Sequence, residues 1–440
     1  MQFIIILRTL RGRRRLACRL KIGLPFLLAS FYPLSALAAP LTLEQAWEQA
    51  EQANPDLRAA QANLSTAQGE LTDARALLWN NPQLSTEWRK RTLPQTSGTP
   101  LSSHEWTIGL AQAFEIAGQQ GLRRSAAEQA LAATQAVIAE TQRQVRAEVE
   151  QQFVRVLSLQ QRIQMEERTL KLVEEAASAV GKRVSAGEDS RLDGNLARVE
   201  AGRAQNQVAI LREQLIQARA ALATLLQLPT DSLPEPGGSL DSPSAAYTLD
   251  ELLAAAANRP LLRAYDHQQK SARSRLTLER AAIYPDITVG VNTSREGLDN
   301  PQDRISGLSV SLPLPLFRRN ATGIGRATTE LARAQVQQQV GHRDTRAQVL
   351  AQWARRENLQ TRVKQLSESV LPRLEDNQHL SSVSFRAGEI GLLQLLLVNR
   401  QVLDGQRDLL DARTELRLAK VALEAAAGWP THTASAKQNP

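Results

Sequence analysis

The amino-acid sequence predicts a mainly α-helical fold with a small β part, built from two internal repeats of about 200 residues. Three observations lead to this prediction. Apolar residues recur every three or four positions across residues 119–184, which marks one helix about 100 Å long. Two pairs of short segments alternate apolar and polar residues, as β-strands do. Two motifs recur at an offset of 201 residues, namely Ala186-Gly187-Glu188 with Ala387-Gly388-Glu389 and Leu228-Pro229 with Trp429-Pro430.

Residues 1–38 are predicted to be a secretory signal peptide. Basic residues precede an apolar stretch over 22–34, and Ala36 and Ala38 form the A-x-A pattern of a cleavage site. A membrane anchor is the alternative, although about 13 apolar residues are too few to span a bilayer as a helix. The single cysteine, Cys18, lies in this segment. Its lipidation is a second alternative, and cleavage would leave the mature chain without a thiol.

The two repeats are expected to contain the same elements in the same order. A helix (about 42–78 and 249–282) opens with a capping-box pattern, Thr42 with Gln45 and Thr248 with Glu251. Two strands follow, then a very long helix (about 119–184 and 322–385), a tight turn and a last helix (about 190–226 and 390–427). The repeats are expected to span 39–228 and 248–430, with a linker over 229–247 and a C-terminal tail over 431–440.

The predicted strands have one apolar face and one small or polar face. This alternation over about ten residues is typical of transmembrane strands, and surface hairpins on a soluble helical protein are the alternative. A sheet in a bilayer must close, because an open edge leaves backbone groups unpaired in hydrocarbon. Four strands are too few, so several chains must share one barrel, and three would give twelve strands. The residues expected to face lipid are Trp88, Trp106, Ile108, Leu110, Ile287, Val289, Leu308 and Val310.

The chain offers little support for nucleic-acid binding or catalysis. Its formal charge is +8, but seven of its 53 basic residues lie in the first 38 positions, which leaves 46 against 45 acidic residues. The five histidines have no metal-binding spacing, and the glycine-containing segment 323–328 lacks the third glycine of a dinucleotide loop. We therefore expect no enzyme activity, no cofactor, no high-affinity metal site and no nucleic-acid partner.

With these elements in this order, the sequence resembles the TolC-type outer-membrane efflux family over essentially the whole mature chain. The likeness is carried by residues 43–59 with Asn54-Pro55, residues 114–123, residues 312–320 and the paired Ala-Gly-Glu turns. Within the family, the Pro-Leu-Phe stretch in 312–320 is most similar to the CzcC-type heavy-metal (cobalt-zinc-cadmium) efflux branch. The resemblance implies a homotrimer with a twelve-stranded transmembrane β-barrel in the outer membrane. Long antiparallel helices would continue it as a periplasmic α-barrel.

The resemblance also implies a function in the cell outer membrane of a Gram-negative bacterium. The chain would be the passive exit duct of a tripartite proton-driven efflux pump, in contact with outer-membrane lipid. Its partners would be a periplasmic adaptor (membrane fusion protein) and an inner-membrane RND-type transporter. Heavy-metal cations are the expected cargo, with organic compounds, drugs or secreted polypeptide as the alternative. A soluble periplasmic coiled-coil scaffold or adaptor is the alternative of another class.

Two sets of site residues follow from the resemblance. Family members meet the adaptor at their helical tips, which here are Ala186, Gly187, Glu188, Ala387, Gly388 and Glu389. These glycines also suit the left-handed position that ends a helix, and both roles are compatible. The TolC protein carries acids six and nine positions after the second turn glycine, where this chain has Gln394 and Leu397. Asp193 and Gln394 are the candidate pore-constricting residues, Glu188 and Glu389 could form the ring instead, and solvated surface charge is the alternative.

Overall fold

The computed structural model describes residues 40–96, 98–229, 231, 233–241, 247–298 and 301–429. The chain divides after Ala39 into two units, and the fold below is that of the second unit, Pro40–Pro440. The predicted signal peptide with Ala36 and Ala38, and the predicted tail over 431–440, lie outside the described residues. None of the helices in the described part is both long enough and apolar enough to cross a bilayer.

Each repeat opens with two helices where the sequence predicts one. α1 (Leu43–Ala53) is followed by α2 (Pro55–Ala74), and in the second repeat α5 (Leu249–Ala257) is followed by α6 (Pro260–Ala281). The break falls at the residue before a proline, because the proline ring disfavours the helical conformation there. Asn54 then caps α2 by accepting hydrogen bonds from two backbone N–H groups. Both predicted capping boxes, at Thr42 and Thr248, are present.

The longest helix, α3 (Gln119–Ala186), has 68 residues and packs against α2, α4 (Arg191–Leu225), α6 and α9 (Leu392–Ala427). Its counterpart in the second repeat is interrupted, contrary to the prediction of one helix over 322–385. α7 (Ala321–Gln365) passes through a π-helical turn, η1 (Leu366–Val370), into α8 (Leu371–Arg386). The turn ends two residues before Pro372. This proline has no N–H to donate to the preceding turn of helix, so an extra residue is accommodated there.

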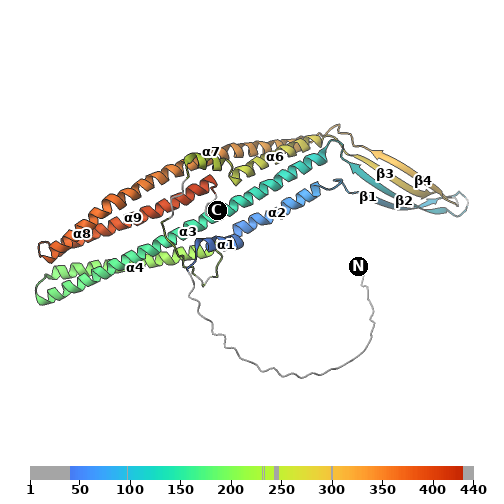
Figure 1. The fold of residues 1–440 in the computed structure, drawn as a ribbon. Helices are drawn as coiled ribbons and strands as arrows, with labels where there is room; N and C mark the ends of the chain where they lie inside the picture. The colour runs from blue at the N-terminus through green and yellow to red at the C-terminus, as the bar shows by residue number, and fades with distance from the viewer. Residues whose placement is uncertain are drawn as a thin grey trace, which may run out of the picture. The chain divides into compact units, whose positions relative to one another are not determined.

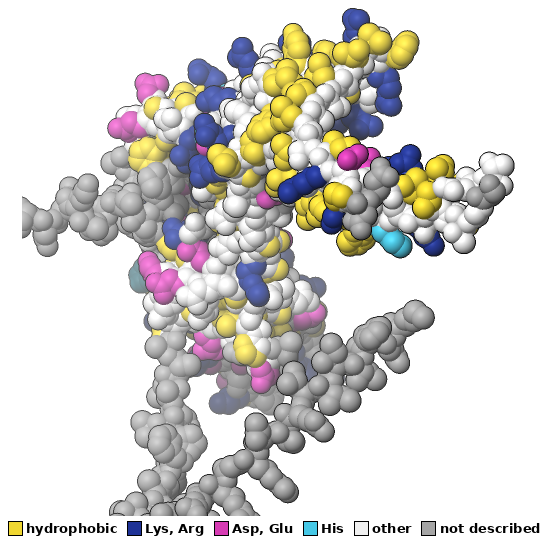
Figure 2. All heavy atoms as spheres, turned by 90° about the vertical axis from the view of Figure 1, so that its right-hand side faces the viewer, with side chains coloured by type: hydrophobic (Ala, Val, Ile, Leu, Met, Phe, Trp, Pro, Cys, Tyr) yellow, Lys and Arg dark blue, Asp and Glu magenta, His cyan; other side chains and the backbone are white. Residues whose placement is uncertain are grey.

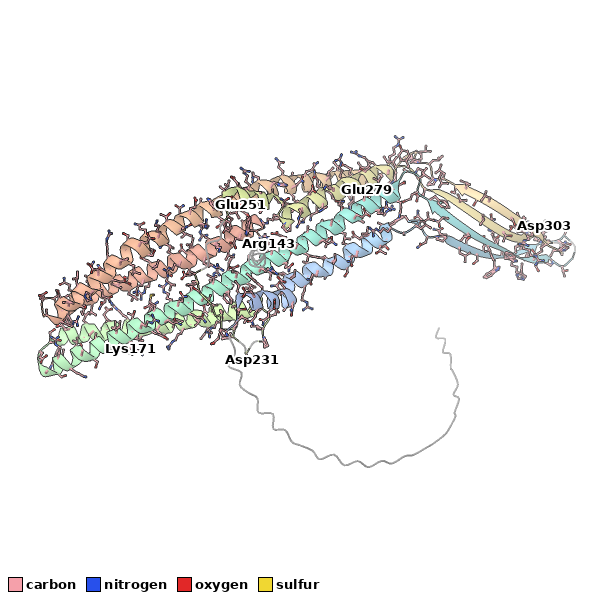
Figure 3. The ribbon with its side chains drawn as sticks, viewed as in Figure 1. Arg143, Lys171, Asp231, Glu251, Glu279 and Asp303 are labelled. Carbon is pink, nitrogen blue, oxygen red and sulfur yellow. The ribbon has the colours of Figure 1, made fainter. Side chains whose placement is uncertain are left out.

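The helices run side by side between the sheet at one end and the two interhelical turns at the other (Figure 1). Glu279 lies at the sheet end of α6, Arg143 lies in the middle of α3, and Lys171 lies toward the turn end (Figure 3). α3 and α4 form one antiparallel hairpin, and α8 and α9 form the other. The elements at the sheet end are tied together by Asn320, whose Nδ2 donates to the carbonyl oxygen of Glu279 at 2.9 Å.

The four strands form one antiparallel sheet in the order β1-β2-β3-β4. They are β1 (Gln83–Leu93), β2 (Leu101–Phe114), β3 (Ile287–Glu296) and β4 (Asp303–Ser311). Pairing of β2 with β3 joins the two repeats. The strands extend further into the predicted polar loops than the sequence indicated, because β1 continues to Leu93 and β2 begins at Leu101.

The apolar core lies where the short helices pack on the long ones. In the first repeat Trp47 of α1 is buried against Val149 and Phe153 of α3, and Leu222 of α4 completes the cluster. The indole Nε1 of Trp47 donates to the carbonyl oxygen of Arg146 at 3.0 Å, so the buried ring keeps its hydrogen bond. The second repeat contains an equivalent cluster of Tyr247, Leu252, Val349 and Leu423.

Candidate functional site

The strand register brings all eight residues of the predicted lipid-facing set to one face of the sheet. Trp88 pairs with Trp106, and Leu110 pairs with Val291, which pairs in turn with Leu308. Because directly paired residues point to the same side of a sheet, these pairs connect the apolar positions of all four strands. Five members of the set are exposed large hydrophobic residues, namely Trp88, Ile108, Leu110, Leu308 and Val310.

The opposite face of the sheet carries mostly small or polar residues. Gly109 lies opposite Ser85, and Gly290 lies opposite Ser309. A Cβ atom added at these glycines would stand only 2.8 Å and 2.7 Å from the serine Oγ atoms, so a larger residue would displace its neighbour. The glycines therefore allow polar side chains to lie close over this face. Figure 2 looks onto the end of the molecule that carries the sheet and shows hydrophobic side chains with Lys and Arg at their margins.

The outer strands β1 and β4 have one paired edge each within the described residues, because they end the strand order. Every residue of β1 and every residue of β4 is exposed. An edge of nine or more unpaired residues is a template for pairing with a further strand. The sheet is therefore open on both sides.

The two predicted tip turns have the same backbone geometry. Gly187 and Gly388 have φ angles of 80° and 76°, in the left-handed region that glycine adopts at helix ends. The N–H of the residue after each glycine donates to the carbonyl five residues earlier, from Glu188 to Arg183 and from Glu389 to Ser384, at 2.9 Å in both turns. All six residues predicted to contact an adaptor are exposed, and a Cβ added at either glycine would have no heavy atom within 4 Å.

The two candidate pore-constricting residues lie on different hairpins, and no contact between them is present among the described residues. Asp193 is half-buried and engaged locally, because its Oδ2 accepts from Ser190 Oγ at 2.6 Å and its N–H donates back to that oxygen. Gln394 is exposed in the first turn of α9, where its N–H donates to the carbonyl of Gly391. Ser190 therefore caps α4, and the carboxylate of Asp193 accepts a hydrogen bond from the hydroxyl of this capping residue.

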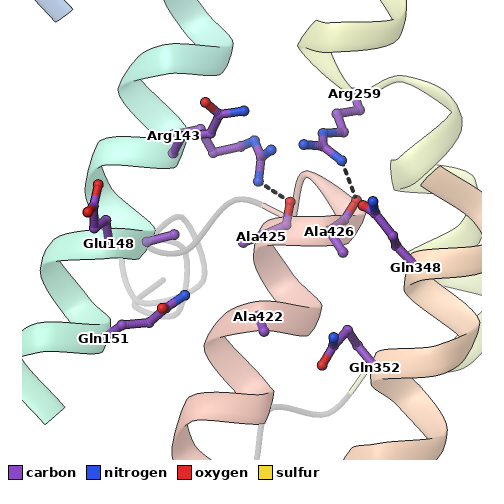
Figure 4. A pocket seen from close by; sticks show the side chains of 11 residues that line it. Arg143, Glu148, Gln151, Arg259, Gln348, Gln352, Ala422, Ala425 and Ala426 are labelled. Carbon is purple, nitrogen blue, oxygen red and sulfur yellow. Dashed lines mark hydrogen bonds between the residues drawn. The ribbon is translucent and has the colours of Figure 1, made fainter. Parts of the chain in front are cut away.

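Sequence reasoning missed a buried ionic cluster at the middle of the molecule, in which Glu140 of α3 is only 3% exposed. Arg259, just before α6, donates to Glu140 Oε1 at 2.6 Å, and Arg143 donates to the same oxygen at 2.5 Å. The two arginines also donate to backbone carbonyls at the end of α9, Arg143 to Ala425 and Arg259 to Ala426 (Figure 4). Positive charge there complements the negative end of the helix dipole, at the carbonyls of the last turn of α9.

Burial acts to raise the pKa of Glu140, but the hydrogen bonds and charges of Arg259 and Arg143 outweigh burial and lower this pKa. The carboxylate is therefore ionised at neutral pH and holds three segments together, α3, the start of α6 and the end of α9. A cavity of about 320 Å³ opens beside the cluster between α3, α7 and α9, and Gln348 and Gln352 line its far wall (Figure 4).

The cluster continues as a polar seam between α3 and α9. Arg407 donates to both oxygens of Glu166 at 2.6 Å and 2.7 Å, and Arg417 donates to Glu150 at 2.6 Å. Burial raises the pKa of Glu150, the nearby Glu424 adds to this effect, and Arg417 only partly offsets it. A signal was present in the sequence, because the apolar stripe of 119–184 has gaps at the positions of Glu140 and Glu166.

Among the described residues, no group of three or more His, Cys, Asp or Glu side chains is placed to hold a metal ion. The features that the structure brings together are instead a two-faced sheet with open edges, long helices and two exposed glycine turns.

Comparison with known proteins places this arrangement in a family. The model of the outer membrane efflux protein family matches residues 46–227 and 252–429. The chain is 28% identical over 376 residues to the cobalt-zinc-cadmium resistance protein CzcC of Cupriavidus metallidurans, which covers 86% of this chain and 85% of that protein. It is 27% identical over 423 residues to the pyoverdine export outer membrane protein OpmQ of Pseudomonas putida, covering 89% and 87%.

The fold is also that of the outer membrane protein VceC from Vibrio cholerae. The TM-score is 0.75 at 19% identity, and the match covers 88% of this chain and 96% of that chain. The predicted mainly α-helical fold with four strands is confirmed, and the same family model matches both halves, as the predicted repeat requires. The likeness to CzcC supports the predicted heavy-metal branch. The chain belongs to the outer membrane efflux protein family.

Proposed function

We propose that this chain is the outer-membrane channel of a tripartite efflux pump and that it conducts heavy-metal cations out of the cell. The observation that carries the proposal is the four-stranded sheet, which has one apolar face, one mostly small or polar face and two edges without a partner strand in the described part of the chain. Such a sheet is stable in hydrocarbon only when its edges are closed. Pairing β4 of one copy with β1 of the next, three times over, gives a closed barrel of twelve strands.

In this barrel the apolar face contacts outer-membrane lipid and the polar face lines the pore. The inward face supports this assignment, because glycine and serine at Gly109, Gly290 and Ser309 leave the lumen side small. The helices of three copies continue the duct as an α-barrel into the periplasm of a Gram-negative cell. We assign residues 1–38 to a signal peptide, 39–228 and 248–430 to the two repeats, 229–247 to a linker and 431–440 to a tail.

The duct is passive, and the energy for transport comes from a proton-driven RND-type transporter in the inner membrane, linked by a periplasmic adaptor. Heavy-metal cations are the proposed cargo because CzcC is named for cobalt, zinc and cadmium resistance. The competing cargo, an organic compound, is favoured by the likeness to a pyoverdine export protein. Asp193 and Gln394 are proposed to narrow the pore near the tips, where three copies of each would form a ring.

Deleting the gene should lower tolerance to zinc, cobalt and cadmium while tolerance to antibiotics stays unchanged. Growth on graded metal and drug concentrations, with the gene restored on a plasmid as the control, measures this difference. Sensitivity to drugs with unchanged metal tolerance would instead assign an organic cargo.

Fractionation of the cell tests whether the protein is an outer-membrane channel. A heat-sensitive trimer in the outer-membrane fraction supports the channel. Release of the protein by osmotic shock would contradict it and favour a soluble scaffold.

The tip turns give a separate prediction. Replacing Gly187 or Gly388 by leucine should weaken adaptor binding and leave trimer formation intact, because the open space over these glycines would be filled. Cross-linking to the adaptor and native gels of the trimer measure the two effects. Alanine at the same position costs about 1 kcal/mol of backbone strain but adds little volume, so it separates strain from bulk. Normal cross-linking in the leucine variants would refute the assignment.

A further inference from the structure

We propose that the apolar face of the sheet carries a binding site for the phosphate groups of an anionic lipid headgroup in the outer leaflet. The site consists of Arg295 of β3 and Arg304 of β4, and His104 of β2 and Lys90 of β1 lie on the same face in the next row across the sheet. This inference rests on the proposed function, because it requires the sheet to stand in the outer membrane. It adds a specific ligand and a specific place to general contact with lipid.

The register places the two arginines side by side. Arg295 pairs directly with Arg304, and on its other side it pairs with Trp106, which pairs with Trp88. One row across the sheet therefore contains two tryptophans followed by two arginines. Lys90 and His104 form a direct pair between β1 and β2. This pair lies two residues beyond the pair of Trp88 and Trp106, toward the loop that joins these strands. All four basic side chains are exposed and share the apolar face.

This row differs from the opposite face in its charge pairing. On the polar face Arg89 donates to Glu87 at 2.7 Å, and Arg91 donates to Glu105 at 3.4 Å. Arg295, Arg304 and Lys90 make no ion pair with any described residue, and no described acidic residue of the strands shares their face. Like charges directly opposite each other on paired strands destabilise a sheet. A bound anion between Arg295 and Arg304 would relieve this repulsion.

The position of the row identifies the anion as part of a lipid. Trp106 and Phe114 are eight residues apart on β2, about 27 Å along the strand. With a strand tilt of about 40°, this span rises about 21 Å, close to the height of about 25 Å for the apolar band of outer-membrane barrels. Tryptophan is enriched at the membrane interface, so the row lies at the headgroup level. It is at the end of the sheet away from the helices, which is the outer leaflet.

Arginine suits this role because its planar guanidinium binds phosphate through two hydrogen bonds. Two neighbouring arginines can hold a headgroup that carries two phosphates. A glycolipid with a phosphorylated sugar headgroup, such as lipid A, has this chemistry and is the probe for the test.

The test titrates fluorescent lipid A into the full mature chain, purified as a trimer in non-ionic detergent at low salt. Arg295→Gln combined with Arg304→Gln should weaken binding about thirtyfold, as expected for two interfacial basic residues. The control is Arg89→Gln with Arg91→Gln, which removes two charges from the opposite face of the same sheet and should leave the affinity unchanged. Arg295→Lys with Arg304→Lys keeps the charge but loses the paired hydrogen bonds, so its affinity should lie between those of the wild type and the glutamine variant.

Equal affinities for wild type and the Arg295→Gln, Arg304→Gln variant would overturn the site, as would an equal loss in the control. Inorganic phosphate added in excess should leave lipid A bound, and displacement by phosphate alone would overturn the lipid assignment. Flotation of the wild type with phosphatidylcholine vesicles tests membrane association separately from the arginine site. A protein that floats but shows no dependence on the arginines contradicts only this site. A protein that does not float contradicts the proposed function as well.

Discussion

Replacing Glu140 by alanine is expected to lower the free energy of unfolding by about 3–5 kcal/mol. The carboxylate is 3% exposed and accepts hydrogen bonds from Arg143 and Arg259, which are bound in turn to the end of α9. Its removal leaves two partly buried cations without their counter-ion. The free-energy cost of these unpaired charges exceeds the gain from no longer burying a carboxylate. Thermal unfolding of the detergent-purified protein, followed by circular dichroism, measures the effect.

The matched control is Glu148→Ala, which lies on the same helix but is exposed. This surface change should alter stability by less than about 0.5 kcal/mol. Similar melting temperatures for the two variants would show that the ionic cluster does not hold the helices together.

The contribution of Glu140 should also depend on pH. Its pKa is lowered from the ordinary value of 4.5 in the folded state, so folding favours the charged form. Stability from this group is therefore complete above about pH 4.5 and is lost as the pH falls through the lowered pKa. The difference in melting temperature between wild type and Glu140→Ala should be large at pH 7 and should shrink in acid. A constant difference across this range would contradict the assigned charge state.

In the proposed trimeric barrel, replacing Val291 by arginine is expected to destabilise the membrane-inserted form by about 2–4 kcal/mol per chain. Val291 is 53% exposed on the apolar face and lies between Leu110 and Leu308 in the middle of the sheet. A charge there would stand in hydrocarbon with no partner. The temperature at which the trimer dissociates, on gels of outer-membrane extracts heated in steps, reports the change.

The neighbouring substitution Asn292→Arg provides the control, because residue 292 is exposed on the polar face. The proposed pore side contains water, so this variant should dissociate near the wild-type temperature. If both variants behave alike, the two faces of the sheet do not have the different surroundings that we assign to them.

The local features of the fold were predictable from the sequence because their causes are local. The capping boxes at Thr42 and Thr248 and the tip glycines depend on neighbours within five residues, and the structure contains all of them. The face of each strand residue follows from simple alternation. The eight apolar positions thus share one side once the strands pair without a bulge.

The parts that were missed have longer-range causes or weak local signals. Arg259 meets Glu140 across 119 residues of sequence, and no local pattern states which arginine will reach which acid. The helix breaks at Asn54 and before Pro260 had a visible cause in proline, yet the apolar period continues across them. The π-helical turn before Pro372 is similar, because the period alone cannot distinguish a kinked helix from a straight one.

The pairing of β2 with β3 has a consequence for how the chain is built. Trp106 and Arg295 are 189 residues apart, so this pair closes a very long loop. Packing of α3 against α6 brings the start of one helix next to the end of the other, and Gln119 of α3 reaches the carbonyl of Ala281. Helical docking should therefore come first and lower the entropic barrier for the sheet. On the proposed route to the outer membrane, the chain would complete its apolar sheet face late, which shortens the time that this face spends in water before assembly.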